Sequence, residues 1–305
     1  MIEIHADDYG MFVDESRSII ECINEGCVNG ISIMPNSEHF DESMKMLQVE
    51  CDKNCMISVH LDLITGKAML RSRFLADEEG YFKNSYGKLM LISLIPFIRS
   101  RYKADIKAEL SEQINKCIPY MNEKGKIRID SHRHFHMIPM VFAVIMDIVD
   151  SKGLELEYIR MSTDSYRLYD NLFSYETFRP INVIKSILLS IFKCINELRF
   201  RDRIRGKYKK FASILFSGCM TKSNMIRILD RISICNYQLQ DYEIMVHPGG
   251  VVNDVDLFEI HNQEDREFLQ SKLRMVEYTA VKDDEVLELI DALNSCQKEN
   301  ILNEN

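Results

Sequence analysis

Short apolar segments alternate with amphipathic segments along most of the chain, and this alternation limits the folds that the chain can adopt. The apolar segments have the length and composition of strands: 2–6, 30–35, 56–61, 127–130, 156–161 and 243–247. Between them, apolar residues recur at helical spacing over 14–24, 42–49, 106–121 and 140–152. Strands that alternate with helices form a mainly parallel sheet. We therefore expect an α/β fold of six or seven strands, arranged as an open doubly wound sheet or as a barrel.

Composition and charge exclude several classes of protein. The chain has 305 residues, of which 46% are apolar and 28% charged, and this is too apolar for an intrinsically disordered chain. A net charge of −9 argues against a nucleic acid partner, because proteins that bind polyanions present basic surfaces. The longest apolar segments, 89–98 and 181–195, are too short or too interrupted by lysines to cross a bilayer.

The cysteines and the first residues favour a reducing compartment. Nine cysteines are scattered along the chain without the spacing of a disulfide framework or a zinc site, and we expect them to be reduced thiols. The N-terminal segment reaches Asp7 and Asp8 directly, without the basic region and apolar run of a secretory signal. We therefore expect a cytoplasmic protein.

Four groups of polar residues lie where a predicted strand ends and a loop begins, at the edge where parallel α/β folds build their active sites. They are His5-Ala6-Asp7-Asp8-Tyr9-Gly10, His60-Leu61-Asp62, Asp130-Ser131-His132-Arg133-His134-Phe135-His136 and His247-Pro248-Gly249-Gly250. Each group has an ordinary structural alternative, since Asp-Asp-x-Gly suits a turn and a single histidine can form hydrogen bonds within a core. The third group is the most informative, because three of the eight histidines fall within five residues.

Taken together, the four groups have the composition of a hydrolytic metal site. Adjacent carboxylates repel each other unless a positive charge lies between them. Neutral imidazoles bind divalent transition metals, and a nearby carboxylate such as Asp130 can fix their tautomer. A set of one aspartate and two histidines leaves coordination positions open for water and substrate. The remaining carboxylate and histidine could act as the base and the acid of an amide hydrolysis.

In this order, and spread over about 250 residues, these motifs resemble those of the YdjC-like carbohydrate deacetylases. The matching segments are 6–10, 60–67, 130–139 and 247–249. The resemblance implies an irregular, TIM-like (β/α) barrel of about seven parallel strands. It also implies a hydrolase that removes the acetyl group from an N-acetylated sugar such as an N-acetylglucosamine oligosaccharide. In such an enzyme Asp8, His60 and His132 would hold one divalent metal ion, Mg²⁺ or Zn²⁺, while Asp7 would be the base and His247 would assist the leaving group.

The expected organisation is one barrel domain over residues 1–295, with a basic helical insertion at about 179–212 and a polar tail over 296–305. Two departures from the family pattern concern sugar specificity: Ile64 stands where threonine is common, and Arg133 stands where histidine is common. His136 is a reserve metal ligand, because a helix would place it on the same face as His132. Pro139 and the preceding strand favour a loop instead, and we therefore prefer His60 and His132.

Two other functions fit the same residues. A metal-dependent phosphoesterase would bind two metal ions, and His5, His134 and His136 could supply the additional ligands. A non-catalytic sugar- or metal-binding relative would keep the fold without releasing acetate. The number of ions bound per chain distinguishes the first alternative from a deacetylase, and acetate release distinguishes the second.

Segment 181–210 joins an apolar half to a basic half in which only Glu197 and Asp202 oppose the lysines and arginines. It has three interpretations. The helix packs its apolar face on the body of the protein, or it forms a lid or a homodimer contact beside the site, or it is an interfacial helix that meets anionic lipid.

Overall fold

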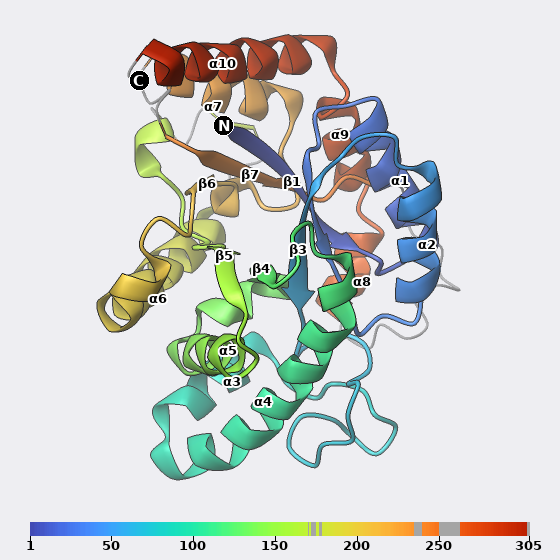
Figure 1. Cartoon of the computed structure of the whole chain (residues 1–305), viewed down its shortest axis with the longest axis vertical. Coiled ribbons are helices and arrows are strands. Elements are labelled where there is room, and N and C mark those ends of the chain that lie inside the picture. The colour runs from blue at the N-terminus through green and yellow to red at the C-terminus, as the bar shows by residue number, and fades with distance from the viewer. Residues whose placement is uncertain (170, 172–174, 177–178, 235–239, 250–262, 304–305) are drawn as a thin grey trace.

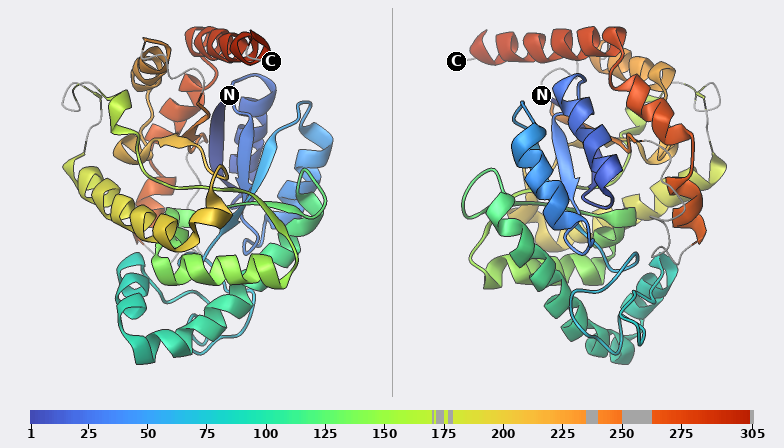
Figure 2. Two further views of the ribbon diagram at one scale, coloured as in Figure 1. Left: turned by 60° about the vertical axis from the view of Figure 1, so that its left-hand side comes forward. Right: turned by 90° about the vertical axis from the view of Figure 1, so that its right-hand side faces the viewer.

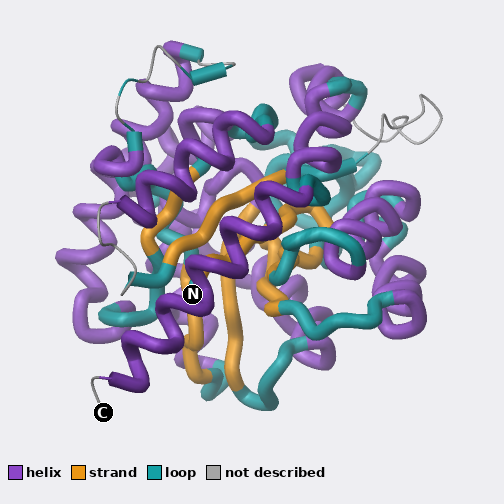
Figure 3. The backbone as a smooth tube through the Cα atoms, turned by 90° about the horizontal axis from the view of Figure 1, so that it is seen from above, coloured by secondary structure: helices purple, strands orange, loops and turns teal. Residues whose placement is uncertain are grey.

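The centre of the molecule is a sheet of seven parallel strands in the order β5-β4-β3-β2-β1-β7-β6. The computed structural model describes residues 1–303 apart from 170, 172–174, 177–178, 235–239 and 250–262. Helices surround the strands, as seen from the side in Figure 1 and from above in Figure 3. The predicted TIM-like arrangement of about seven parallel strands is confirmed. The strands are β1 (Ile2–Tyr9), β2 (Gly30–Ile33), β3 (Met56–Leu61), β4 (Lys126–Ser131), β5 (Glu155–Ile159), β6 (Lys210–Ala212) and β7 (Tyr242–Val246).

The helices of the described residues follow the strands in the chain order expected of a β/α fold. The α-helices are α1 (Val13–Asn24), α2 (Phe40–Glu50), α3 (Tyr86–Leu94), α4 (Pro96–Cys117), α5 (Pro139–Ser151), α6 (Pro180–Ile204), α7 (Lys222–Ile234), α8 (Gln263–Leu269), α9 (Leu273–Ala280) and α10 (Asp284–Asn303). The 3₁₀ helices include η1 (Ile118–Tyr120), η2 (His132–Met137), η3 (Tyr166–Leu168) and η5 (Ile214–Phe216). None of the helices in the described part of the chain combines the length and apolar character needed to cross a membrane.

The sheet curls so that its two edge strands approach each other. Asp164, beyond the end of β5, forms an isolated parallel bridge with Phe211 of β6. The backbone N–H of Ile159 donates to the carbonyl oxygen of Lys207 at 2.8 Å, and that of Ser165 donates to Phe211 at 2.9 Å. The result is an irregular barrel whose strands all end at the same edge, because all of them are parallel.

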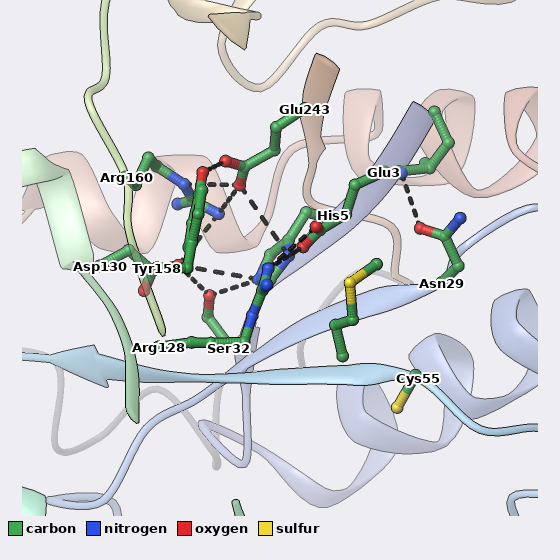
Figure 4. A network of polar contacts seen from close by, with 12 residues as sticks. Glu3, His5, Asn29, Ser32, Cys55, Arg128, Asp130, Tyr158, Arg160 and Glu243 are labelled. Carbon is green, nitrogen blue, oxygen red and sulfur yellow. Dashed lines mark hydrogen bonds and ion pairs between the residues drawn. The ribbon is translucent and has the colours of Figure 1, made fainter. Parts of the chain in front are cut away.

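Alternation along β1 divides its side chains between two environments. Ile2 and Ile4 are fully buried in the hydrophobic core that the surrounding helices cover. Glu3 and His5 lie on the other face of the strand, inside the curl of the sheet, among polar side chains from other strands (Figure 4). The interior of this barrel is therefore largely polar, and its charged groups need partners to be stable there.

Glu3 anchors the polar interior at the start of β1. Its carboxylate accepts two hydrogen bonds from Arg128, at 2.6 and 2.9 Å, and forms an ion pair with Lys209. His5 lies 2.6 Å from Glu3 through Nδ1 and 2.7 Å from Ser32 through Nε2. These side-chain contacts join β1, β2 and β4 to the segment just before β6.

The charges inside the barrel balance when Glu243 is neutral. Burial raises the pKa of Glu243 well above its ordinary value, and the carboxylates of Glu3 and Asp130 raise it further. The other acidic and basic side chains that form ion pairs inside the barrel then comprise three carboxylates and three cations. They are Glu3, Asp7 and Asp130 against Arg128, Arg160 and Lys209.

The segment expected to be a basic helical insertion, at about 179–212, contains helix α6. Helix α6 connects β5 with β6 and packs against β5, so it is a crossover helix of the barrel. Strand β6 has three residues, which is too few for an alternating pattern to be visible in the sequence. At the other end of the chain, α10 continues to Asn303, through most of the expected polar tail.

We predict that Glu3→Gln lowers the free energy of unfolding by about 3–5 kcal/mol at pH 7, because Arg128 and Lys209 lose their common carboxylate. Urea denaturation measures this loss. Although burial alone would raise the pKa of Glu3, its contacts with His5 and Arg128 hold it below the ordinary value of 4.5. The contribution of Glu3 to the free energy of unfolding is therefore present above pH 4.5 and is lost as the pH falls below this value. The difference between the two proteins should shrink accordingly in acid.

The matched control is Glu25→Gln, which removes the exposed ion pair between Glu25 and Lys282. Its effect should be much smaller, because exposed ion pairs contribute little to stability. Equal losses for the two variants would contradict the importance of the interior network.

Candidate active site

The end of β1 places two consecutive carboxylates at the edge of the barrel. In a regular strand, Asp7 and Asp8 would point to opposite faces. Here Asp8 has a φ of 65°, and the register between β1 and β2 shifts between Ala6 and Tyr9. A bulge of this kind redirects a side chain, and aspartate tolerates the left-handed conformation better than most residues. Both carboxylates are consequently buried, Asp7 beside Arg160 and Asp8 beside two histidines.

Asp8, His60 and His132 meet at this edge although they lie more than 120 residues apart at the extremes. Nε2 of His60 lies 3.2 Å and Nδ1 of His132 lies 2.9 Å from Oδ1 of Asp8. The two imidazole rings are nearly perpendicular, with centroids 5.8 Å apart. One potential ligand atom from each of the three residues lies within 4.8 Å of the others, and all three residues are buried.

Asp130 holds His60 in position from the neighbouring strand. The register of β3 and β4 pairs His60 with Asp130, and Nδ1 of His60 donates to Oδ1 of Asp130 at 2.7 Å. This bond directs the other ring nitrogen towards Asp8. Asp130 in turn accepts a hydrogen bond from Ser32 and forms an ion pair with Arg160 at 3.0 Å, as Figure 4 shows. A carboxylate that orients a histidine in this way is a common companion of metal-binding histidines.

The electrostatics of this group favour a cation. Burial alone would raise the pKa of Asp8, but His132 and His60 hold it well below its ordinary value. Burial alone would lower the pKa of His60, but Asp130 and Asp7 raise it to about 9. Oδ2 of Asp8 is buried and has no hydrogen-bond partner among the described residues. One carboxylate and two imidazoles with converging donor atoms are a suitable ligand set for a divalent cation.

The structure places His136 away from this group. Nδ1 of His136 lies 2.6 Å from the hydroxyl of Ser131, and Nε2 donates to the carbonyl oxygen of Arg160 at 2.7 Å. Burial lowers the pKa of His136 to about 4, and the ring is therefore neutral. Arg133 and His134 adopt left-handed backbone conformations within η2, so 132–136 is not a regular helix with two histidines on one face.

The other histidines considered as ligands for a second metal ion, His5 and His134, lie among arginine and lysine side chains or in apolar surroundings. His5 belongs to two groups with converging donor atoms, Glu3-His5-Glu243 and His5-Asp7-Asp130. The carboxylates of both groups are paired with Arg128, Arg160 or Lys209, and these cations would oppose a metal ion. Burial lowers the pKa of His134 well below its ordinary value, and its ring packs edge-on against Phe211. Among the described residues, the groups around His5 are therefore less suitable for a metal ion than Asp8, His60 and His132.

Asp7 forms a double hydrogen bond with Arg160, which directly follows β5. Nη1 and Nη2 of Arg160 donate to the two carboxylate oxygens of Asp7 at 2.7 and 2.8 Å. The same guanidinium donates through Nε to Glu243 at 2.7 Å. Two oxygens carry about four acceptor sites, so Asp7 retains the capacity to accept a proton from another group.

His247 follows β7 at the same edge and is held by Glu277 of α9. Its backbone N–H donates to Oε2 of Glu277 at 2.5 Å, and its Nδ1 lies 3.8 Å from the same oxygen. Its ring packs edge-on against Phe268, with centroids 5.2 Å apart. Burial alone would lower the pKa of His247, but Glu277 raises it above the ordinary value. A histidine with a raised pKa and a fixed ring is suited to donating a proton.

Two residues that position this site were not predicted from the sequence. Arg160 lies near the end of the predicted strand 156–161, but a single arginine there has no distinctive spacing. Glu277 lies in a helix about 30 residues beyond His247, and nothing in the local sequence indicates that the two residues meet.

Comparisons with known proteins point to one family. The family model described as YdjC-like protein matches residues 1–292. A chitooligosaccharide deacetylase of Escherichia fergusonii is 24% identical over 162 residues, which cover 53% of this chain and 60% of the relative. A carbohydrate deacetylase of Clostridium beijerinckii is 25% identical over 160 residues, which cover 52% and 59%. Over the matched part, the chain thus spans about three fifths of the length of these two relatives.

A third relative and a solved structure extend the comparison. A carbohydrate deacetylase of Thermoanaerobacter pseudethanolicus is 26% identical over 205 residues, which cover 64% of this chain and 76% of the relative. A crystal structure from Enterococcus faecalis, described as that of a putative cellobiose-phosphate cleavage protein, superposes with a TM-score of 0.66. It is 19% identical, with 96% of this chain and 94% of the other covered. At this identity the solved structure supports the fold.

We predict that Asp130→Asn weakens Zn²⁺ binding by about 10- to 100-fold, because the carboxylate that orients His60 is lost. Isothermal titration calorimetry on the metal-free protein measures this change. The control is His39→Ala, which removes a histidine outside the group. Unchanged affinity in Asp130→Asn would contradict both the role of Asp130 and the assignment of His60 as a ligand.

Proposed function

Because the chain belongs to the YdjC-like family, we propose that it is a metal-dependent carbohydrate deacetylase, which hydrolyses the N-acetyl group of a sugar to acetate and a free amine. The observation that carries this proposal is the convergence of Asp8, His60 and His132 at one edge of the barrel. The names of its relatives, which are chitooligosaccharide and carbohydrate deacetylases, support the substrate class.

In this proposal Asp8, His60 and His132 hold one divalent cation, Zn²⁺ or Mg²⁺. When bound there, such an ion supplies Lewis-acid polarisation of the acetyl carbonyl and makes water a better nucleophile. Two imidazole ligands favour zinc, and the small number of protein ligands also suits a hydrated magnesium ion. Asp130 keeps His60 aligned through the 2.7 Å hydrogen bond.

Asp7 acts as the general base and accepts a proton as water attacks the acetyl carbon. The double hydrogen bond from Arg160 fixes the plane of its carboxylate, so little reorganisation is needed when the proton arrives. Arg160 also pairs with Asp130. One guanidinium therefore contacts both Asp7 and Asp130, the residue that orients His60.

His247 acts as the general acid and donates a proton to the departing nitrogen, since an amide anion is too basic to leave unprotonated. Glu277 raises the pKa of the imidazole above its ordinary value, against the effect of burial, and fixes the backbone next to it. A base and an acid contributed by different strands can act on opposite sides of the scissile bond.

The proposal predicts acetate release from short N-acetylglucosamine oligomers. A chelator should abolish this release, and added Zn²⁺ or Mg²⁺ should restore it. Asp7→Asn should retain the metal but lower kcat by about 10²- to 10⁴-fold, because the proton acceptor is lost. Enzymatic acetate detection and metal analysis of the purified proteins measure the two effects, and Asp52→Asn, on the surface, is the control.

Two results would contradict this function. Acetate release that a chelator leaves unchanged would remove the metal from the reaction. Metal and sugar binding without any acetate release would instead indicate a binding protein that has kept the fold.

We further predict that Glu277→Gln shifts the alkaline limb of the pH–kcat profile to lower pH. Glu277 raises the pKa of His247, so the wild-type acid stays protonated to a higher pH and activity falls as the pH rises through that pKa. Without the carboxylate, this fall should begin earlier. An alkaline limb at the same pH in both proteins would argue that His247 is not the acid.

A further inference from the structure

Two helical segments leave a series of large apolar side chains in solvent. Along α6 they recur every three or four residues, and Leu198 at the end of the series is 81% exposed. At the junction of α3 and α4 they are nearly consecutive, and Phe97 is 85% exposed. The members are Ile181, Ile184, Ile187, Ile191, Ile195 and Leu198 on α6, and Leu91, Leu94, Ile95, Phe97 and Ile98 at the junction. Exposed apolar surface of this extent marks an interaction site.

The two segments lie on the same side of the molecule. Both α3 and α6 pack against η2, the short helix that begins with His132. Figure 1 and the left view of Figure 2 both show α6 and the α3–α4 junction on this side, with α5 between them. We call the exposed residues of the two segments, with the basic residues described next, the apolar-basic face.

Basic side chains extend both apolar series. On α6 the exposed face continues into Arg199 and Arg201, and into Arg205 directly after the helix. At the start of α4 it continues into Arg99, Arg101 and Lys103. Residues 80–104 contain five lysines or arginines and no acid, and residues 179–210 contain ten against two acids. Because the whole chain carries a net charge of −9, positive charge is concentrated in these two segments. The exposed acids of α5 between them, Asp147 and Asp150, pair with Lys107 and Arg203.

We propose that the apolar-basic face docks on an anionic lipid bilayer. The apolar side chains would enter the boundary between headgroups and acyl chains, while the flanking arginines and lysines would meet lipid phosphates. The two apolar segments and the two basic groups act together, which matters because one weak membrane signal gives only marginal binding.

Charge decides between this occupant and two others. A second copy of the chain would bring two positively charged faces together, and this repulsion opposes self-association through the face. A nucleic acid would match the charge but would leave the leucine, isoleucine and phenylalanine side chains without an apolar partner. An anionic bilayer satisfies both parts of the face.

The experiment is flotation of the full chain with two kinds of vesicle: phosphatidylcholine alone, and phosphatidylcholine mixed with phosphatidylglycerol. We expect the protein to float with the mixed vesicles only, and less at high salt. The double variants Leu94→Ser/Phe97→Ser and Ile191→Ser/Leu198→Ser should each reduce the bound fraction by about tenfold or more, because two inserted apolar side chains are lost.

Matched controls lie on the opposite side of the molecule, on α2 (Figure 1). Val49→Ser removes an apolar side chain that is 82% exposed, and it should leave flotation unchanged. Arg99→Glu/Arg101→Glu should weaken flotation, whereas Lys45→Glu, an exposed residue of α2, should not. Thermal melting followed by circular dichroism confirms that each variant is folded.

Three results would overturn the proposal. The first is no flotation of the wild type with the mixed vesicles, and the second is equal flotation of the wild type and both serine double variants. The third is a dimer in analytical ultracentrifugation that the same double variants dissociate, without vesicle binding by the wild type. In that case the face would be an interface between copies of this chain.

Discussion

The guanidinium of Arg160 is the interaction on which both the barrel interior and the candidate site depend. It is fully buried and contacts Asp7, Asp130 and Glu243. The carboxylates of Asp7 and Asp130 would repel each other strongly in a medium of low dielectric constant, and the same repulsion favours the neutral form of Glu243. A planar cation with five donors can contact several of them at once. The geometry of Asp7 and the orientation of His60 by Asp130 thus both depend on one side chain.

Much of the fold could be predicted from the sequence, because strands and helices with regular apolar spacing are recognisable in it. Polar residues at the ends of parallel strands meet at one edge of the sheet, and this rule predicts that the four polar groups lie together. The resemblance to the family then identifies Asp8, His60 and His132 among them. The rule holds here because the sheet is parallel throughout, so that the ends of β1, β3 and β4 lie at the same edge. The structure shows that these residues lie together, and their chemical roles are proposals.

Other features have no signature in the sequence. Strand β6 is recognisable only by its neighbours, because three residues are too few to show a period. The partnership of His247 with Glu277 depends on how α9 returns to the sheet, which is a property of the packing. The burial of Arg160 depends on carboxylates from β1, β4 and β7, and no local pattern indicates that Asp7, Asp130 and Glu243 contact the same arginine.

The left-handed backbone at Asp8 also restricts how this protein can evolve. Among the amino acids, glycine, asparagine and aspartate adopt that conformation readily, and β-branched residues do so at considerable cost. The backbone conformation alone therefore limits which residues can replace Asp8, whatever the side chain does. Descendants that have lost the ancestral chemistry but kept the barrel should carry asparagine or glycine here far more often than valine or isoleucine. Such a replacement would remove the carboxylate and leave the fold of the barrel unchanged.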